Sequence, residues 1–148
     1  MHGPALVATL GLQPQIITRS LDLLLEETVA PDLAEVVIIH TSAYPHRHPH
    51  WRSLDEFKSY CQERYPDIAW RWRPIQDEQG ETVYDVETPE TAELVFRLIY
   101  NEVKRLKRAG QRLHGLIAGG RKSMIVYTLF SAQLLFDSDD RLWHLFSI

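Results

Sequence analysis

Two positive side chains and a serine follow a pair of glycines in the segment HGLIAGGRKSM, which runs from His114 to Met124. Apolar residues precede the glycines and resume after the serine, so we expect a buried strand to give way to a helix at this point. Glycine lets a ligand approach the backbone closely, and the N–H groups at a helix start attract anions. With Arg121 and Lys122 at the same place, the segment predicts a phosphate-binding turn.

A second turn of this type lies near the start of the chain, in the segment ATLGLQPQIIT that begins at Ala8. It also carries glycine, and Pro14 suits the first turn of the helix that follows. Neither segment is a better-known phosphate loop. A P-loop has lysine directly after its second glycine, whereas here Arg121 stands between Gly120 and Lys122, and GLQPQ lacks the Gly-x-Gly-x-x-Gly spacing of dinucleotide sites. We therefore expect neither a P-loop nucleotidase nor a dehydrogenase.

The rest of the chain alternates between strand patterns and helix patterns. Strands are expected over residues 5–10, 35–40, 67–75, 112–119 and 141–148, and helices over residues 14–29, 53–65, 88–110 and 121–136. A short hairpin arm is expected around Gly80. This order predicts an α/β, Rossmann-like fold with a mostly parallel central sheet of about five to six strands and helices on both faces. Ligands of such sheets lie beyond the carboxyl ends of the strands, near the switch point.

Length and composition narrow the class of protein. The chain has 148 residues, 45% of them hydrophobic, and a net charge of −4, which predicts one globular domain over residues 1–148 and argues against a protein that coats DNA. Cys61 is the only cysteine, so no internal disulfide can form, as suits a reducing cytoplasm. We find no signal peptide, and the longest apolar stretch, from Met124 to Phe136, is too short and mixed to span a membrane. A cytoplasmic protein is expected.

The two turns, taken together, resemble the signature segments of CRISPR-associated Rossmann-fold (CARF) domains, and above all the stand-alone ring nucleases of type III systems. LVATLGLQPQIITRSLDLL resembles the first segment, HGLIAGGRKSM the second, and VETPETAELVFRLIYNEVKRL the helix before the second. The resemblance covers most of the chain. It implies a homodimer that binds cyclic oligoadenylate across its axis, most often the tetra-adenylate ring, with no cofactor. Some members only sense the ring and switch an effector, whereas others cut it.

The resemblance also implies a set of site residues. The ligand-binding positions of the family fall on Thr9, Gly11, Leu12, Gln13, Gln15, Thr18, Gly119, Gly120, Arg121, Lys122 and Ser123. Lys122 is expected to stabilise the transition state, with Arg121 second and Thr9 helping to position the ring. No metal is implied, because in this class the ribose 2′-hydroxyl attacks the adjacent phosphate and leaves a 2′,3′-cyclic phosphate. No general base is evident from the sequence, since His114 falls at the wrong end of its strand.

Several alternatives stay open at this point. The chain ends after its fifth expected strand without an effector domain, which favours a ring nuclease over a sensor. A sensor or sink that works through a partner chain, or a small nucleotide-binding protein outside CRISPR signalling, remains the alternative. Three interpretations of the loop with His46, His48 and His50 stay open: a solvated loop, a metal site, or a flap over the ligand. For the dimer, we expect contacts through the last helix and the exposed side of the first.

The strand pattern around AWRWR raises a related question. Trp70 and Trp72 are expected in the core or at the dimer surface, whereas Arg71 and Arg73 lie on the other face. The two arginines either reach the cationic pocket or are solvated.

Overall fold

The sheet and its helices are taken from a computed structural model, which describes residues 3–11, 13–26, 29–44, 49–86, 88–117 and 122–144, with only the backbone of Lys122 and Ser123. Strand and helix patterns alternate along the chain as expected. The strands are β1 (Ala5–Thr9), β2 (Glu35–His40), β3 (Ala69–Pro74), β4 (Leu113–Leu116) and β5 (Arg141–Trp143). The helices are α1 (Gln15–Glu26), α2 (Leu54–Arg64), α3 (Pro89–Arg108) and α4 (Lys122–Leu135).

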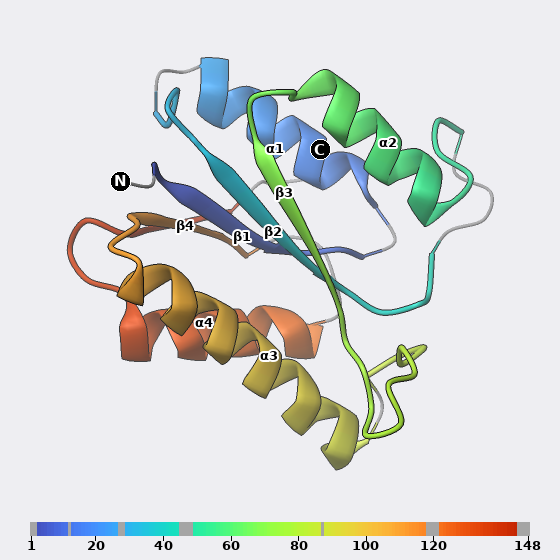
Figure 1. The fold of residues 1–148 in the computed structure, drawn as a ribbon. Helices are drawn as coiled ribbons and strands as arrows, with labels where there is room; N and C mark the ends of the chain where they lie inside the picture. The colour runs from blue at the N-terminus through green and yellow to red at the C-terminus, as the bar shows by residue number, and fades with distance from the viewer. Residues whose placement is uncertain are drawn as a thin grey trace.

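The five strands form one parallel sheet in the order β3-β2-β1-β4-β5. Helices α1 and α2 cover one face, and α3 and α4 cover the other (Figure 1). The α/β, Rossmann-like prediction is confirmed, with five strands in the described sheet. The strand order reverses between β1 and β4, which makes the carboxyl edge of this pair the switch point where ligands of such folds bind.

The central strands are buried on both faces, which explains their unbroken apolar runs. In β1, Leu6 and Ala8 point into the core beneath α1 and α2, whereas Ala5 and Val7 point into the core beneath α3 and α4. Gly115 in β4 sits against β5, because a Cβ at this position would lie 2.9 Å from the Cδ2 atom of Leu142. This glycine therefore belongs to the packing of the strand and not to a phosphate loop.

Local sequence signals correctly predicted the start of α2 and both ends of α3. The side chain of Ser53 accepts the Glu56 N–H at 3.1 Å and caps α2, although the Glu56 carboxylate reaches the N–H of Arg52 rather than that of Ser53. Thr88 caps α3 in a capping box with Thr91. Gly110 ends the same helix with a φ of +78°, a conformation that favours glycine.

The expected length of the first helix was wrong at its end. The sequence pattern places Val29 on the apolar face of that helix, but α1 spans Gln15–Glu26, and Val29 lies in a bend and is 42% exposed. The N–H of Ala30 donates to the carbonyl of Leu24, six residues earlier, at 3.0 Å. The helix has therefore ended before Val29, although the apolar pattern continues to that residue.

One buried carboxylate gathers three arginines on the α3 face of the sheet. The Glu102 side chain is 5% exposed and lies 3.3 Å from Arg71, 2.7 Å from Arg73 and 3.1 Å from Arg105. Arg105 also contacts Glu35 at 2.8 Å. Neither expectation for Arg71 and Arg73 was complete, because both side chains are partly exposed and both contact an acid of α3.

The tryptophans of the same strand lie on the opposite face. The rings of Trp70 and Trp72 stack at 5.4 Å and pack, partly buried, against the core under α1 and α2. Their core placement is confirmed.

A second buried carboxylate joins α3, β4 and the turn before β5. Asp140 accepts the N–H groups of Leu113 and Asp137 at 2.8 and 2.9 Å, and the ammonium of Lys107 lies 2.8 Å away. The cations at the end of α3 therefore pair with specific acids in addition to complementing the helix dipole.

Two buried histidines, His114 and His40, carry the ring proton on different nitrogen atoms. The indole N–H of Trp143 donates to Nδ1 of His114 at 2.8 Å, so the neutral His114 ring carries its proton on Nε2. Nδ1 of His40 lies 3.0 Å from the carbonyl of Thr41 and therefore carries the proton there. Burial lowers the pKa of both rings below the ordinary value of 6.5.

We expect His114→Gln to weaken the loss of stability that occurs in acid. A histidine with a lowered folded-state pKa stabilises the protein fully above its unfolded pKa of about 6.5, and this stability is lost as the pH falls below that value. Charging His114 would also break its bond with Trp143. Urea unfolding at several pH values between about 7.5 and 5 tests this expectation, and parallel curves for wild type and variant would contradict it.

Candidate ligand-binding site

The two predicted turns begin side by side at the carboxyl edge of the sheet. β1 pairs with β4 in parallel, with Val7 opposite Gly115. The same register carried forward places Thr9 beside Ile117, on strands about 4.8 Å apart. Helices α1 and α4 then leave this edge on opposite faces of the sheet (Figure 1). The switch point is therefore flanked by two helix starts, each of which favours an anion.

The first turn contributes a mixture of exposed and buried groups. Thr9 ends β1 and is 1% exposed, so its side chain is enclosed in this ligand-free structure. Gln13 is exposed, and Gly11 and Gln15 are partly exposed, whereas Leu12 lies outside the described residues. The hydroxyl of Thr18 donates to the carbonyl of Gln15 at 3.1 Å, which supports the backbone of the turn from inside the helix.

Backbone donors of the first turn are already partly committed. The N–H of Ile16 donates to Gln13 at 3.0 Å, that of Ile17 to Pro14 at 3.1 Å, and that of Leu10 to Ile39 at 2.9 Å. Pro14 itself has no N–H. An anion at this helix start would therefore lie near the backbone of Gly11 and Gln13, ahead of these bonded amides.

The second turn is described only from its helical side. Gly119, Gly120 and Arg121 lie outside the described residues, whereas α4 begins at Lys122 with Ser123 next. Their place in the first turn of a helix agrees with the prediction. Met124 follows and is 1% exposed, so the helix is fixed to the core directly behind these two positions.

His40 is a titratable group at this edge that our sequence reasoning missed. It ends β2, the neighbour of β1, and is 5% exposed. Its Nε2 atom is buried without a hydrogen-bond partner, and burial, together with the charge of Lys58, lowers its pKa. The sequence did offer one signal for this residue, namely a histidine at the end of the apolar run EVVIIH. Because Nε2 is enclosed, His40 is not open to a ligand in this conformation.

Most of the histidine-rich loop lies outside the residues that the structure describes. Residues 45–48, with His46 and His48, are outside the described residues. Trp51, the aromatic residue considered for a flap over the ligand, packs at 4.9 Å against both Phe57 and Tyr60 of α2. In the described part of the chain no group of three histidine, cysteine or acidic side chains is arranged to hold a metal ion.

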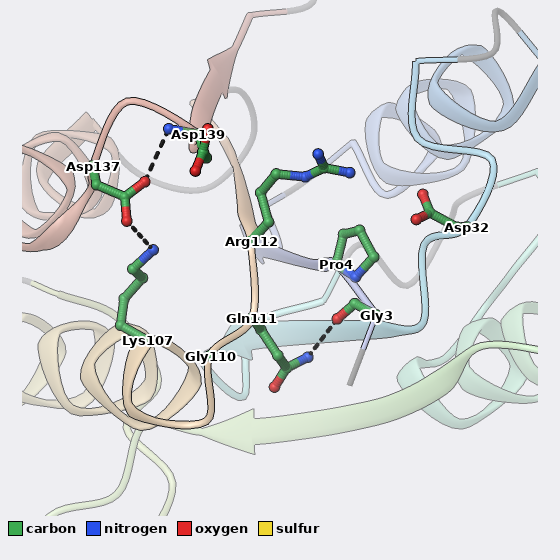
Figure 2. A pocket seen from close by; sticks show the side chains of 9 residues that line it. All are labelled: Gly3, Pro4, Asp32, Lys107, Gly110, Gln111, Arg112, Asp137 and Asp139. Carbon is green, nitrogen blue, oxygen red and sulfur yellow. Dashed lines mark hydrogen bonds and ion pairs between the residues drawn. The ribbon is translucent and has the colours of Figure 1, made fainter. Parts of the chain in front are cut away.

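A pocket of about 590 Å³ lies at the opposite, amino edge of the sheet (Figure 2). Lys107 reaches Asp137 across it at 2.9 Å, and the Gln111 amide donates to the carbonyl of Gly3 at 3.0 Å. Arg112 extends between the turns before β2 and β5 (Figure 2). These contacts join the end of α3 to neighbouring turns, far from the edge at which both motif turns begin.

Helix α4 is apolar on two sides. One side packs on α3 and the sheet, where Thr128, Ser131 and Ala132 are buried. The other side leaves large residues in solvent, namely Val126 at 44%, Leu129 at 39%, Phe130 at 51% and Leu134 at 65% exposure. A groove of about 440 Å³ separates this side from Leu142 of β5. An apolar surface of this kind commonly marks an interaction site.

The fold and the paired turns define a Rossmann-like domain with an anion-favouring switch point. The chain belongs to the family of CRISPR-associated protein NE0113 (Cas_NE0113), whose sequence profile matches residues 13–147. The resemblance to CRISPR-associated Rossmann-fold domains is thereby confirmed for family and fold. No curated protein matches the chain significantly in sequence.

Two solved structures share the fold. One is Enterococcus italicus Csm6 bound to cyclic hexa-2′-fluoro-hexa-dAMP, with a TM-score of 0.68 at 9% identity over 99% of this chain and 34% of the Csm6 chain. The other is a type III CRISPR defence DNA nuclease activated by cyclic oligoadenylate, with a TM-score of 0.59 at 15% identity over 98% of this chain and 19% of that chain. The chain thus spans about a third and a fifth of these proteins. None of the helices that the structure describes has the length and hydropathy needed to cross a membrane.

Proposed function

We propose that the protein binds cyclic oligoadenylate, with the tetra-adenylate ring as the preferred form, at the carboxyl edge of β1 and β4. The observation that carries this proposal is the meeting of two helix-opening turns at adjacent strand ends. The family match supports it. Of the two similar structures described above, one is bound to cyclic hexa-2′-fluoro-hexa-dAMP and the other is activated by cyclic oligoadenylate. The ring phosphates would lie against Gly11, Gln13 and Gln15 on one side and residues 119–123 on the other.

We further propose that the bound ring is cut and that this ends type III CRISPR signalling. The ribose 2′-oxygen attacks the adjacent phosphorus, the bond to the 5′-oxygen breaks, and the proton of the 2′-hydroxyl passes through solvent to the leaving oxygen. Lys122, with Arg121 beside it, stabilises the negative charge on the phosphoryl oxygens. The protein holds the attacking oxygen in line, and such positioning contributes on the order of several kcal/mol.

A second candidate function is a sensor or sink that binds the ring without cutting it. It is favoured by the enclosure of Thr9 and of the Nε2 atom of His40, which keeps these two side chains from contacting a ring in this conformation. A ring that is bound and recovered intact after hours would support this function.

Titrating the protein with cyclic oligoadenylate tests whether it binds the ring. We expect calorimetry with cyclic tetra-adenylate to give one ring per two chains, because a two-fold ring matches a two-fold dimer. Cyclic hexa-adenylate in a parallel titration establishes the preferred ring size. If neither ring binds, the proposed function is wrong.

The apolar side of α4 is where we place the dimer contact, in agreement with the expectation from sequence. Phe130→Glu should convert a dimer into a monomer, because a buried unpaired charge at a contact is costly. Phe130 is 51% exposed in the single chain, so the variant should fold normally, which circular dichroism checks. Light scattering at micromolar concentration gives the mass. A variant that remains dimeric, or a wild type that is monomeric, would contradict this placement.

A further inference from the structure

Between β3 and α3 the chain makes an excursion past the carboxyl edge of the sheet. We call residues 75–86 the arm. It turns at Gly80, whose φ is +80° and whose N–H donates to the carbonyl of Asp77 at 3.0 Å, and it closes with a bridge between Gln76 and Thr82. Figure 1 shows the arm in yellow-green beyond the end of β3. It is the hairpin arm predicted from the sequence.

The returning half of the arm is held firmly in place. The N–H of Val83 donates to the carbonyl of Ile75 at 2.8 Å, and the N–H of Ser42 donates to the carbonyl of Val83 at 2.9 Å. The side chains of Val83 and Val86 pack against the core under α3 and α4, the cluster that also contains Met124. The backbone between these two valines is therefore fixed by hydrogen bonds and by packing.

Tyr84 projects from this fixed segment into solvent and is 71% exposed. An aromatic ring this exposed adds little to the stability of the core, and its backbone is held whether or not the ring has a partner. Such a ring can stack on a nucleobase at a small entropic cost, because a tyrosine side chain has few rotatable bonds to fix.

The arm is connected to the candidate site through two hydrogen-bonded neighbours. Leu10, in the first turn, donates to Ile39 at the end of β2, and Ser42, just after β2, donates to Val83. These bonds place the backbone just before Tyr84 at the rim of this edge, on the side of β2 and β3. A cyclic oligonucleotide carries its bases outward from its phosphates, toward such a rim.

The arm also carries acidic side chains that are unsuited to phosphate. Asp77 accepts the N–H groups of Gln79 and Glu81 at 3.0 Å each, and Glu78 and Glu81 add two exposed acids. Carboxylates repel a phosphate backbone, so these acids do not suit the arm to a phosphate contact, whereas the exposed ring of Tyr84 can stack on a base.

We propose that Tyr84 stacks on an adenine of the bound ring and thereby raises the affinity for the ring. This inference rests on the proposed function and goes beyond it by assigning a base contact to a segment outside both motif turns. In a dimer, the two copies of Tyr84 would hold two bases of one ring.

The test compares binding of cyclic tetra-adenylate by wild type, Tyr84→Ala and Tyr84→Phe. Loss of a stacked base is worth roughly 1–3 kcal/mol, so Tyr84→Ala should bind about 5- to 150-fold more weakly, whereas Tyr84→Phe keeps the ring and the affinity. Tyr60→Ala, which removes a 36% exposed tyrosine on α2, is the matched control and should bind like wild type.

A direct readout of stacking uses a ring in which 2-aminopurine replaces one adenine. Its fluorescence should be quenched by wild type and by Tyr84→Phe, and less by Tyr84→Ala. If Tyr84→Ala binds as wild type does, this inference is wrong and the proposed function stands. If wild type binds no ring, both are wrong.

Discussion

Lys122→Ala should slow ring cleavage by about 10²- to 10³-fold, the usual cost of removing one group that stabilises charge in the transition state. Lys122 stands at the start of α4, the helix that follows β4 along the chain. A cation there meets the phosphoryl oxygens as their charge increases. The rate should be measured in single turnovers with ring bound to excess protein, so that weaker binding does not imitate slower chemistry.

Arg108→Ala is the matched control for this variant. It also removes one positive charge, but from the exposed end of α3, at the amino edge of the sheet. We expect it to cut the ring as wild type does. If Lys122→Ala cuts at the rate of Arg108→Ala, the role assigned to Lys122 is wrong.

Glu102→Ala should produce the largest loss of stability that we expect from a single substitution. The carboxylate is 5% exposed and contacts Arg71, Arg73 and Arg105, so its removal brings three guanidinium groups together without their shared partner. Breaking a buried pair costs about 3–5 kcal/mol, and we expect roughly 3 kcal/mol here because the arginines are partly exposed. The corresponding fall in Tm is on the order of 10 °C.

A second glutamate of the same helix provides the control. Glu93 contacts Arg97 at 2.6 Å, but the two side chains are 68% and 65% exposed. Exposed pairs contribute little, so Glu93→Ala should leave the free energy of unfolding nearly unchanged. Equal unfolding midpoints for the two variants in urea would contradict the stabilising role of Glu102.

Much of the fold could be predicted because its signals are local. Ser53 and Thr88 cap helices through residues three positions later, and Gly110 ends α3 through its own φ angle. The switch point also followed from sequence, since alternating strands and helices imply a parallel sheet. Both motif turns could therefore be assigned to the same edge from the sequence.

Contacts between distant parts of the chain could not be predicted in this way. Arg71 and Glu102 are 31 positions apart, and no pattern in either segment indicates that the two side chains will be in contact. The end of α1 was missed because the apolar pattern continues to Val29, which lies outside the helix. His40 was missed because a polar residue at the end of a buried strand has no periodicity to mark it.

The central claim is that the protein cuts cyclic oligoadenylate without a metal, and product analysis tests it most directly. Purified protein is incubated with labelled cyclic tetra-adenylate in EDTA, and the products are separated by chromatography. We expect linear adenylates that end in 2′,3′-cyclic phosphate. An intact ring recovered from wild type after hours would contradict the claim and would leave a sensor or sink in its place.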